Sequence, residues 1–83
     1  MVVISVTPRR VVPRGRVTIN GAGLLGDALP DVWLGDVEAR VVFASPRRVV
    51  VTVPEGIEGG QTAIRCDGWP AGDVEVSATW VTG

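Results

Sequence analysis

Histidine, tyrosine and lysine are absent from this chain, and cysteine occurs only once. The absence of histidine removes the side chain that most often acts as a general base near neutral pH and that most often binds metal ions. The serines therefore have no imidazole to activate them, and so small a chain has few ways to build a cleft around paired carboxylates. We predict that the chain is not an enzyme and that it binds no cofactor and no metal.

The single cysteine, Cys66, excludes an internal disulfide. Cys66 shares its register with Thr62 and Ile64 in a short run of strand-forming residues, and this alternation directs its side chain inward. A thiol in apolar surroundings behaves as a small hydrophobic group. We predict that Cys66 is buried and unreactive.

Valine fills 17 of the 83 positions, and glycine and proline together fill another 17. Valine favours strands because its branched side chain suits a pleated surface, whereas glycine and proline favour turns. Short valine-rich runs alternate with turn residues about every 8–12 positions, which is the spacing of strands in sandwiches and barrels. We predict one all-β domain over residues 1–83, with strands in segments 2–6, 17–19, 32–34, 37–43, 48–53, 62–66 and 73–80.

Alternation along these segments separates an inward face from an outward face. Trp80 shares a face with Val74 and Val76 and is predicted to pack inside. The other predicted core residues are Ile4, Val6, Val17, Ile19, Val32, Leu34, Ala39, Val41, Val49, Val51, Val53 and Ile64, together with Val74 and Val76.

An ordered series of short motifs follows the pattern of one known family. The motifs are Ile4-x-Val6-x-Pro8, Gly15-x-Val17-Thr18-Ile19-x-Gly21, Val32-x-Leu34-Gly35, Ala39-x-Val41, Val49-x-Val51-x-Val53-Pro54 and Gly60-x-Thr62-x-Ile64. In this order, over nearly the whole chain, they resemble IPT/TIG domains, which occur in plexins and transcription factors. Two positions depart from the family pattern. Arg16 replaces part of a glycine pair, and Leu24, predicted on a surface loop, stands where the family usually has phenylalanine.

The resemblance implies an immunoglobulin-like β-sandwich of about seven strands. It also implies a non-catalytic module that links or abuts other domains, similar to modules of bacterial multidomain proteins. The expected partner is a neighbouring domain of the same parent chain or another protein.

Eight arginines against nine acidic residues leave a net charge of −1. Most of the arginines fall in three clusters, and in a sandwich each cluster shares an end of the molecule with acidic residues, so that the local fields largely cancel. No apolar run approaches the ~20 residues that a membrane span needs. We therefore predict neither nucleic acid nor a membrane among the partners.

The spacing Gly21-x-Gly23-x-x-Gly26 matches a dinucleotide-binding fingerprint letter by letter. That chemistry needs the glycines at a turn from a strand into a helix, whose N-terminus meets the pyrophosphate. Here Pro30 would interrupt such a helix in its first turns. The motif is interpreted as a glycine-rich loop, and no small-molecule cofactor is expected.

Two tryptophans are predicted to lie outside the core. Trp33 alternates with the inward residues Val32 and Leu34, and Trp69 stands between Gly68 and Pro70 in a predicted turn. An exposed tryptophan is costly unless a partner covers it. Trp33 and Trp69 are therefore candidate interaction residues.

Two arginines complete the candidate surface. Arg40 and Arg65, on neighbouring strands, stand where they would either rim an interface or simply cover Trp33 by cation–π stacking. Val42 and Ala63 are expected to extend the same face, which suits a protein partner. A carbohydrate-binding module that stacks the two tryptophans on sugar rings is the alternative function.

Overall fold

The computed structural model describes residues 2–26, 28–57 and 59–77, and every regular element among them is a strand. The strands are β1 (Val2–Thr7), β2 (Arg10–Val11), β3 (Arg16–Ala22), β4 (Val32–Leu34), β5 (Val37–Ala44), β6 (Arg48–Thr52), β7 (Gly60–Cys66) and β8 (Trp69–Val76). The prediction of an all-β fold is confirmed. Within the described ranges there is no helix of the length and apolarity that a membrane crossing requires.

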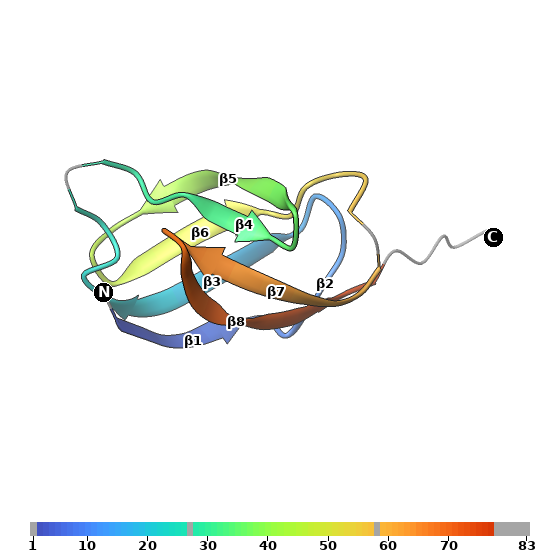
Figure 1. Ribbon diagram of the computed structural model, residues 1–83, viewed down its shortest axis with the longest axis horizontal. Helices are drawn as coiled ribbons and strands as arrows, with labels where there is room; N and C mark the ends of the chain where they lie inside the picture. Colours follow the sequence, from blue (N-terminus) through green and yellow to red (C-terminus); the bar gives the residue numbers. More distant parts are fainter. Residues whose placement is uncertain (1, 27, 58, 78–83) are drawn as a thin grey trace.

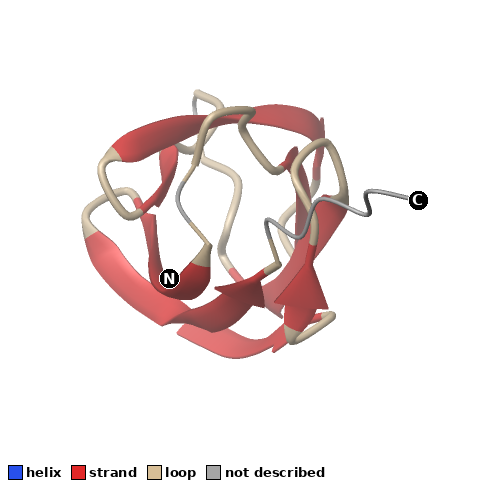
Figure 2. Ribbon diagram, turned by 90° about the vertical axis from the view of Figure 1, so that its right-hand side faces the viewer, coloured by secondary structure: helices blue, strands red, loops and turns tan. Residues whose placement is uncertain are grey.

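The strands form two layers that share β5. Sheet A consists of β1, β3, β6 and residues 40–44 of β5, whereas sheet B consists of residues 37–39 of β5 with β4, β7, β8 and β2. Figure 1 shows β4, β7 and β8 in front of β3 and β6, and Figure 2 looks along the molecule at the strands around the core. The architecture is the expected immunoglobulin-like β-sandwich, in which the first strand is divided between the sheets as β1 and β2.

The inner faces of the two sheets meet in one aliphatic core. Of the 14 core residues predicted within the described ranges, 11 are buried, and Val6 and Val41 pack against them partly buried. The predicted burial of Cys66 is confirmed. Trp80 lies outside the described residues.

Leu24 corrects one expectation, because it is buried rather than placed on a surface loop. Its amide donates a hydrogen bond of 2.9 Å to the carbonyl of Pro46, which holds the segment after β3 against the β5–β6 connection. The Leu24 side chain can then fill the end of the core that the strands leave open. Val11 and Ile57 also join the core without having been predicted.

Ile4 was predicted in the core and is instead 75% exposed. The register of β1 against β3 shifts between Val3 and Ser5, so Ile4 is the extra residue of a β-bulge. A bulge reverses the alternation of side chains beyond it. Val3 and Val6 therefore pack on the core while Ile4 faces solvent.

The segment between β1 and β3, which lies outside the predicted strands, contains the short strand β2. It pairs in parallel with β8, and the amide of Glu75 donates to the carbonyl of Arg9 over 2.7 Å. This pairing carries the chain from sheet A to sheet B and buries Val11.

The turn between β7 and β8 is shorter than predicted, because Trp69 is the first residue of β8 rather than part of the turn. Asp67 and Gly68 form a two-residue turn with φ angles of +52° and +81°. Positive φ at both central residues is typical of a type I′ turn, whose twist matches that of a hairpin.

Candidate interaction surface

Trp33 points away from the core on the outer face of sheet B. Its neighbours Val32 and Leu34 are buried, and the pleat therefore turns Trp33 outward, where 36% of it is exposed. The predicted orientation of Trp33 agrees with the structure. In the ladders of β4, Trp33 stands opposite Arg65 of β7 on one side and Glu38 of β5 on the other.

An open hollow of about 390 Å³, the Trp33 hollow, is lined by Asp31, Trp33, Arg65, Asp67 and Gly68. Two backbone contacts hold its acidic rim together. The amide of Asp31 donates to Oδ1 of Asp67 at 2.9 Å, and the amide of Asp67 donates to the carbonyl of Asp31 at 2.7 Å. The hollow thus combines one aromatic face, two carboxylates and one guanidinium group.

Arg65 is directed along the sheet by a hydrogen bond. Its Nη2 donates to the carbonyl of Gly35 at 3.3 Å, in the turn that joins β4 to β5. Within the described part of the chain the cation–π contact is a different one, between Arg48 and Phe43. The alternative in which Arg65 or Arg40 covers Trp33 by cation–π stacking is therefore not what the structure shows.

The other two predicted residues take different positions. Trp69 pairs with Cys66 and follows Gly68, which lines the Trp33 hollow, so Trp69 stands at the same end of sheet B as that hollow. It is 66% exposed. Arg40 pairs with Thr52 of β6 and thus belongs to sheet A. Val42, expected beside Trp33, also lies in the part of β5 that pairs with β6.

Asp31 and Asp67 were missing from the predicted site, although they complete it. The sandwich topology places the loops that carry them at one end of the molecule, and this signal is available from the sequence. What the sequence does not indicate is that the type I′ turn brings the Asp67 carboxylate onto the amide of Asp31.

Cys66 lies behind the Trp33 hollow, pointing inward from β7. Burial raises the pKa of the Cys66 thiol, and the carboxylates of Asp67 and Asp31 raise it further. A raised pKa keeps the thiol protonated, which makes it a poor nucleophile. The low reactivity predicted for this residue stays a prediction, which the raised pKa and the burial support.

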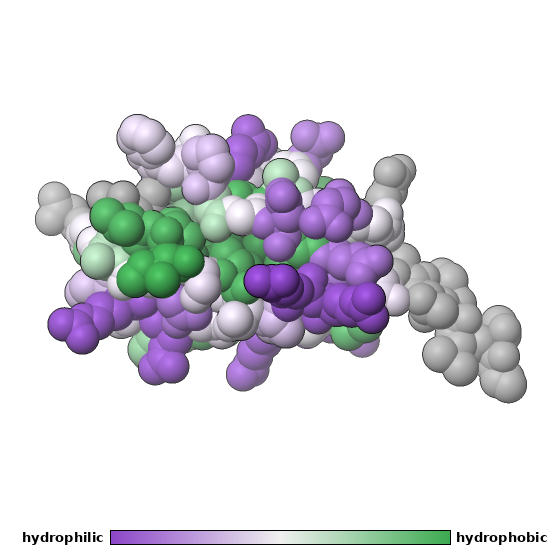
Figure 3. All heavy atoms as spheres, turned by 90° about the horizontal axis from the view of Figure 1, so that it is seen from below, coloured by the Kyte–Doolittle hydropathy of each residue, from purple (hydrophilic) through white to green (hydrophobic). Residues whose placement is uncertain are grey.

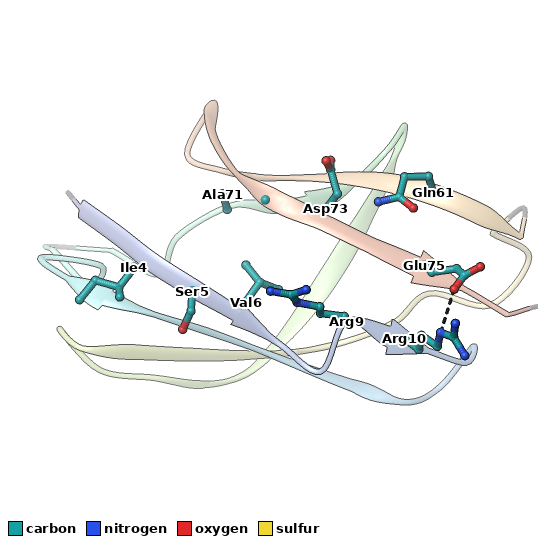
Figure 4. Close-up of a pocket in the computed structure, with 10 residues that line it drawn as sticks. Ile4, Ser5, Val6, Arg9, Arg10, Gln61, Ala71, Asp73 and Glu75 are labelled. Atoms are coloured by element: carbon teal, nitrogen blue, oxygen red, sulfur yellow. Dashed lines mark ion pairs between the residues drawn. The ribbon is translucent and has the colours of Figure 1, made fainter.

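A groove of about 610 Å³ separates the edges of β1 and β8 (Figure 4). One end is apolar, with Ile4 and Ala71, and the other is charged, with an ion pair of 3.0 Å between Arg10 and Glu75. Figure 3 shows an apolar patch on the side where β1 runs. Val2 and Ile4 are the exposed apolar residues of β1. None of the predicted interaction residues lies in this groove.

Two further sequence patterns can be compared with the structure: the glycine spacing after β3 and the mixing of charges at each end of the sandwich. Residues 23–26 and 28–31, which follow β3, contain no helix, so the glycine spacing lacks the helix N-terminus that a dinucleotide site needs. At the opposite end Arg14 forms an ion pair with Glu55, as the mixing of charges at each end predicts. No three side chains that ligate metals gather within the described ranges.

A model of the IPT/TIG domain family matches residues 1–79. Among solved structures, that of gamma-CGTase from an alkalophilic Bacillus clarkii is similar, with a TM-score of 0.76 and 26% identity. The match covers 89% of this chain and 12% of that chain, so the present chain spans a small part of gamma-CGTase. No curated protein sequence matches it. Because the family model covers nearly the whole chain and the fold agrees with it, the chain belongs to the IPT/TIG domain family.

Proposed function

We propose that this chain is a non-catalytic module that packs against a neighbouring domain of a longer protein through the Trp33 hollow and Trp69. IPT/TIG domains are non-catalytic immunoglobulin-like modules. The observation that carries the proposal is the exposure of two tryptophans, 36% for Trp33 and 66% for Trp69, at one end of one sheet. Tryptophan and arginine are enriched at the centres of protein interfaces, and Arg65 stands beside Trp33.

The similarity to gamma-CGTase supports a role as one part of a larger assembly. This chain matches 12% of gamma-CGTase, so a fold of this kind there occupies a small share of a long enzyme chain. A module in that setting needs a surface that holds it to its neighbours, and interfaces between domains of one chain are commonly modest in area and partly polar. The Trp33 hollow has this mixed character.

The test is the pair of substitutions Trp33→Ser and Trp69→Ser in the parent protein. We expect faster limited proteolysis at the domain junctions and a larger scattering radius, because the neighbouring domain loses its contact. In the 83-residue chain alone, Trp69→Ser should leave Tm within a few degrees of the unchanged protein, since substitutions of exposed residues usually change stability by about 0.5 kcal/mol or less. Trp33→Ser should lower Tm further but leave the chain folded, because Trp33 is 36% exposed.

Val12→Ser is the matched control, because Val12 is an exposed apolar residue at the opposite end of the sandwich. It should leave proteolysis unchanged. If Trp33→Ser unfolds the isolated chain, Trp33 acts in folding and the interface proposal fails. If neither tryptophan substitution alters docking in the parent protein, the neighbouring domain uses another surface.

A second function, carbohydrate binding, is favoured by one specific feature of the Trp33 hollow. An aromatic face beside the carboxylates of Asp31 and Asp67 offers both stacking and hydrogen-bond acceptors for hydroxyl groups. A glycan array screened with the 83-residue chain tests this function directly. Saturable binding that Trp33→Ser abolishes would establish it, whereas an empty array leaves the docking function as the one supported.

A further inference from the structure

The two sheets differ in the charge of the residues that build them. The sheet A segments, Val2–Thr7, Arg16–Ala22, Arg48–Thr52 and residues 40–44, contain three arginines and no aspartate or glutamate. The sheet B segments contain Glu38, Asp73 and Glu75 against Arg10 and Arg65. A chain with a net charge of −1 therefore has one sheet in which every charged residue is an arginine.

The three arginines lie on the outer face of sheet A. Val17, Ile19, Val49 and Val51 are fully buried, so the residues that alternate with them along β3 and β6 face outward. Strand register places these residues in three rows, which are Arg16–Thr52–Arg40, Thr7–Thr18–Val50–Phe43 and Ser5–Asn20–Arg48. We call this surface the arginine face. Its middle row is uncharged, and arginines stand in the rows on either side of it.

A bulge supplies the aromatic member of the arginine face. The register of β5 against β6 shifts between Val41 and Phe43, so Val42 is an extra residue and Phe43 turns outward, where it is 48% exposed. The Arg48 guanidinium lies 5.7 Å from the centroid of the Phe43 ring. A strict alternation from Ala39 would have placed Phe43 inside.

Arg48 is also held by its backbone. Its amide donates to Oγ of Ser45 at 3.1 Å, and the amide of Ser45 donates to the carbonyl of Arg48 at 2.7 Å. Stacking on Phe43 and these hydrogen bonds restrict Arg48 before any partner arrives. Restriction in advance lowers the entropy that binding must otherwise remove.

Among the described residues, no acidic side chain forms an ion pair with an arginine of this face. The ion pairs among the described residues join Arg10 to Glu75 and Arg14 to Glu55. Glu38, the acidic residue nearest to Arg40 along β5, lies opposite Trp33 on sheet B. The three arginines of the face thus keep their charge available to a partner.

We propose that the arginine face binds an acidic protein surface. This proposal does not rest on the function proposed for the Trp33 hollow, which lies on the other sheet. Interface centres are enriched in arginine and aromatic residues and depleted in lysine, aspartate and glutamate, and the arginine face has this composition. Strong binding to nucleic acid rests on many phosphate contacts, commonly 6–10, and three arginines around an apolar row provide too few.

Titration of the 83-residue chain with poly-L-glutamate, followed by amide chemical shifts in low salt, tests the proposal. We expect saturable shifts in β3, β6 and residues 40–44, and little change around Trp33. Exposed charge pairs contribute about 0.2–1 kcal/mol each. Replacing Arg16, Arg40 and Arg48 together with glutamine should therefore weaken binding about tenfold.

The matched control replaces Arg9, Arg10 and Arg14 with glutamine, which changes the net charge equally but leaves the arginine face intact. It should weaken binding by no more than about twofold, because it removes only the long-range attraction between the chain and the polymer, which salt screens. Equal weakening by the two triple variants would overturn the proposal, because the binding would then follow net charge alone.

The apolar row gives a second, independent readout. A random copolymer of glutamate and tyrosine should bind more tightly than poly-L-glutamate. Phe43→Ser should remove that preference and should weaken binding to poly-L-glutamate by less than the arginine-face triple variant does, because it loosens Arg48 without removing a charge. One other result overturns the proposal, namely a single-stranded DNA 12-mer that binds more tightly through the same arginines, which identifies a phosphate surface. Self-association that the arginine-face triple variant abolishes supports the proposal and makes a second copy the acidic partner.

Discussion

Sheet A and sheet B bury the same kinds of side chain and present different ones to solvent. On the inside, Val17 and Val51 of sheet A meet Val74 and Leu34 of sheet B, and all four are at most 1% exposed. On the outside, sheet A carries arginines and Phe43, whereas sheet B carries Trp33 among residues of both signs. The two layers are alike where they make the fold and unlike where they meet other molecules.

The difference follows from the pleat. Successive residues of a strand point to opposite faces. The inner residues are therefore constrained by packing in the core, whereas the outer residues can carry charges and aromatic rings. Stability and recognition are thereby divided between alternate positions of the same strands. Substitutions of inner and outer residues should separate these two properties cleanly.

The largest effect is expected where the two sheets are alike. Val51→Ala and Val74→Ala should each lower the free energy of unfolding by about 2–4 kcal/mol, through lost burial and a residual cavity. Thr52→Ala, on the outer face of sheet A, should cost under about 1 kcal/mol. Denaturant melts of the three variants measure this, and equal losses at Val51 and Thr52 would show that the register of β6 is wrong by one residue.

Gly21 tests how closely β1 lies on sheet A. A Cβ atom at Gly21 would collide with the carbonyl oxygen of Val2, and backbone cannot yield as a flexible side chain can. Gly21→Ala should therefore cost about 1–3 kcal/mol and loosen β1, visible as faster amide exchange at Val3 and Val6. Gly26→Ala is the control, because nothing lies within 4 Å of that position. Similar melts for both variants would contradict the close approach of β1.

The core of this fold was predictable because valine alternates with polar residues in its regular strands. Val49, Val51 and Val53 are inward in the sequence pattern and are buried in the structure. The family resemblance added the sandwich architecture, which alternation alone cannot specify. Residues that lie in regular strands between clear turns were therefore assigned correctly.

Bulges account for much of what the sequence did not reveal. The strand registers shift at Ile4, Val42 and Ala71, and each shift reverses the alternation that the prediction depends on. Ile4 and Val42 have neither glycine nor proline beside them, so no local signal marks these two irregularities, whereas Ala71 lies between Pro70 and Gly72. The exposure of Ile4 and the outward turn of Phe43 both follow from such shifts.

A smaller effect on stability is expected from the ionisation of the Cys66 thiol, at the end of sheet B that carries Asp31 and Asp67. The pKa of Cys66 is raised in the folded state by burial and by Asp67 and Asp31, so the unfolded chain loses its thiol proton first as pH rises. Stability is then complete below the unfolded pKa of about 8.5 and falls by up to about 1.4 kcal/mol per pH unit above it, until the folded thiol also ionises.

Urea melts between pH 8 and pH 10 measure this loss, with Cys66→Ala as the variant that should remove most of the slope. The measurement is unusually clean because the chain has no tyrosine and no lysine to titrate in the same range. Asp67→Asn should reduce the slope without removing it, since burial is the larger cause of the raised pKa. A slope that persists in Cys66→Ala would place the titrating group elsewhere.

The smallest expected effect concerns the contact that sheet A makes and sheet B lacks, the stacking of Arg48 on Phe43. A double-mutant cycle with Arg48→Met and Phe43→Leu isolates the pairwise energy, because each change keeps an apolar side chain of similar length or volume. An exposed cation–π pair is worth about 0.5–1 kcal/mol, and the coupling should fall in that range. The coupling should also change little with salt compared with the ion pair of Arg10 and Glu75, because the attraction acts between a ring and a cation in contact. A coupling of zero would mean that Arg48 moves freely over the arginine face, and its placement in advance of binding would then contribute nothing to the affinity for an acidic partner.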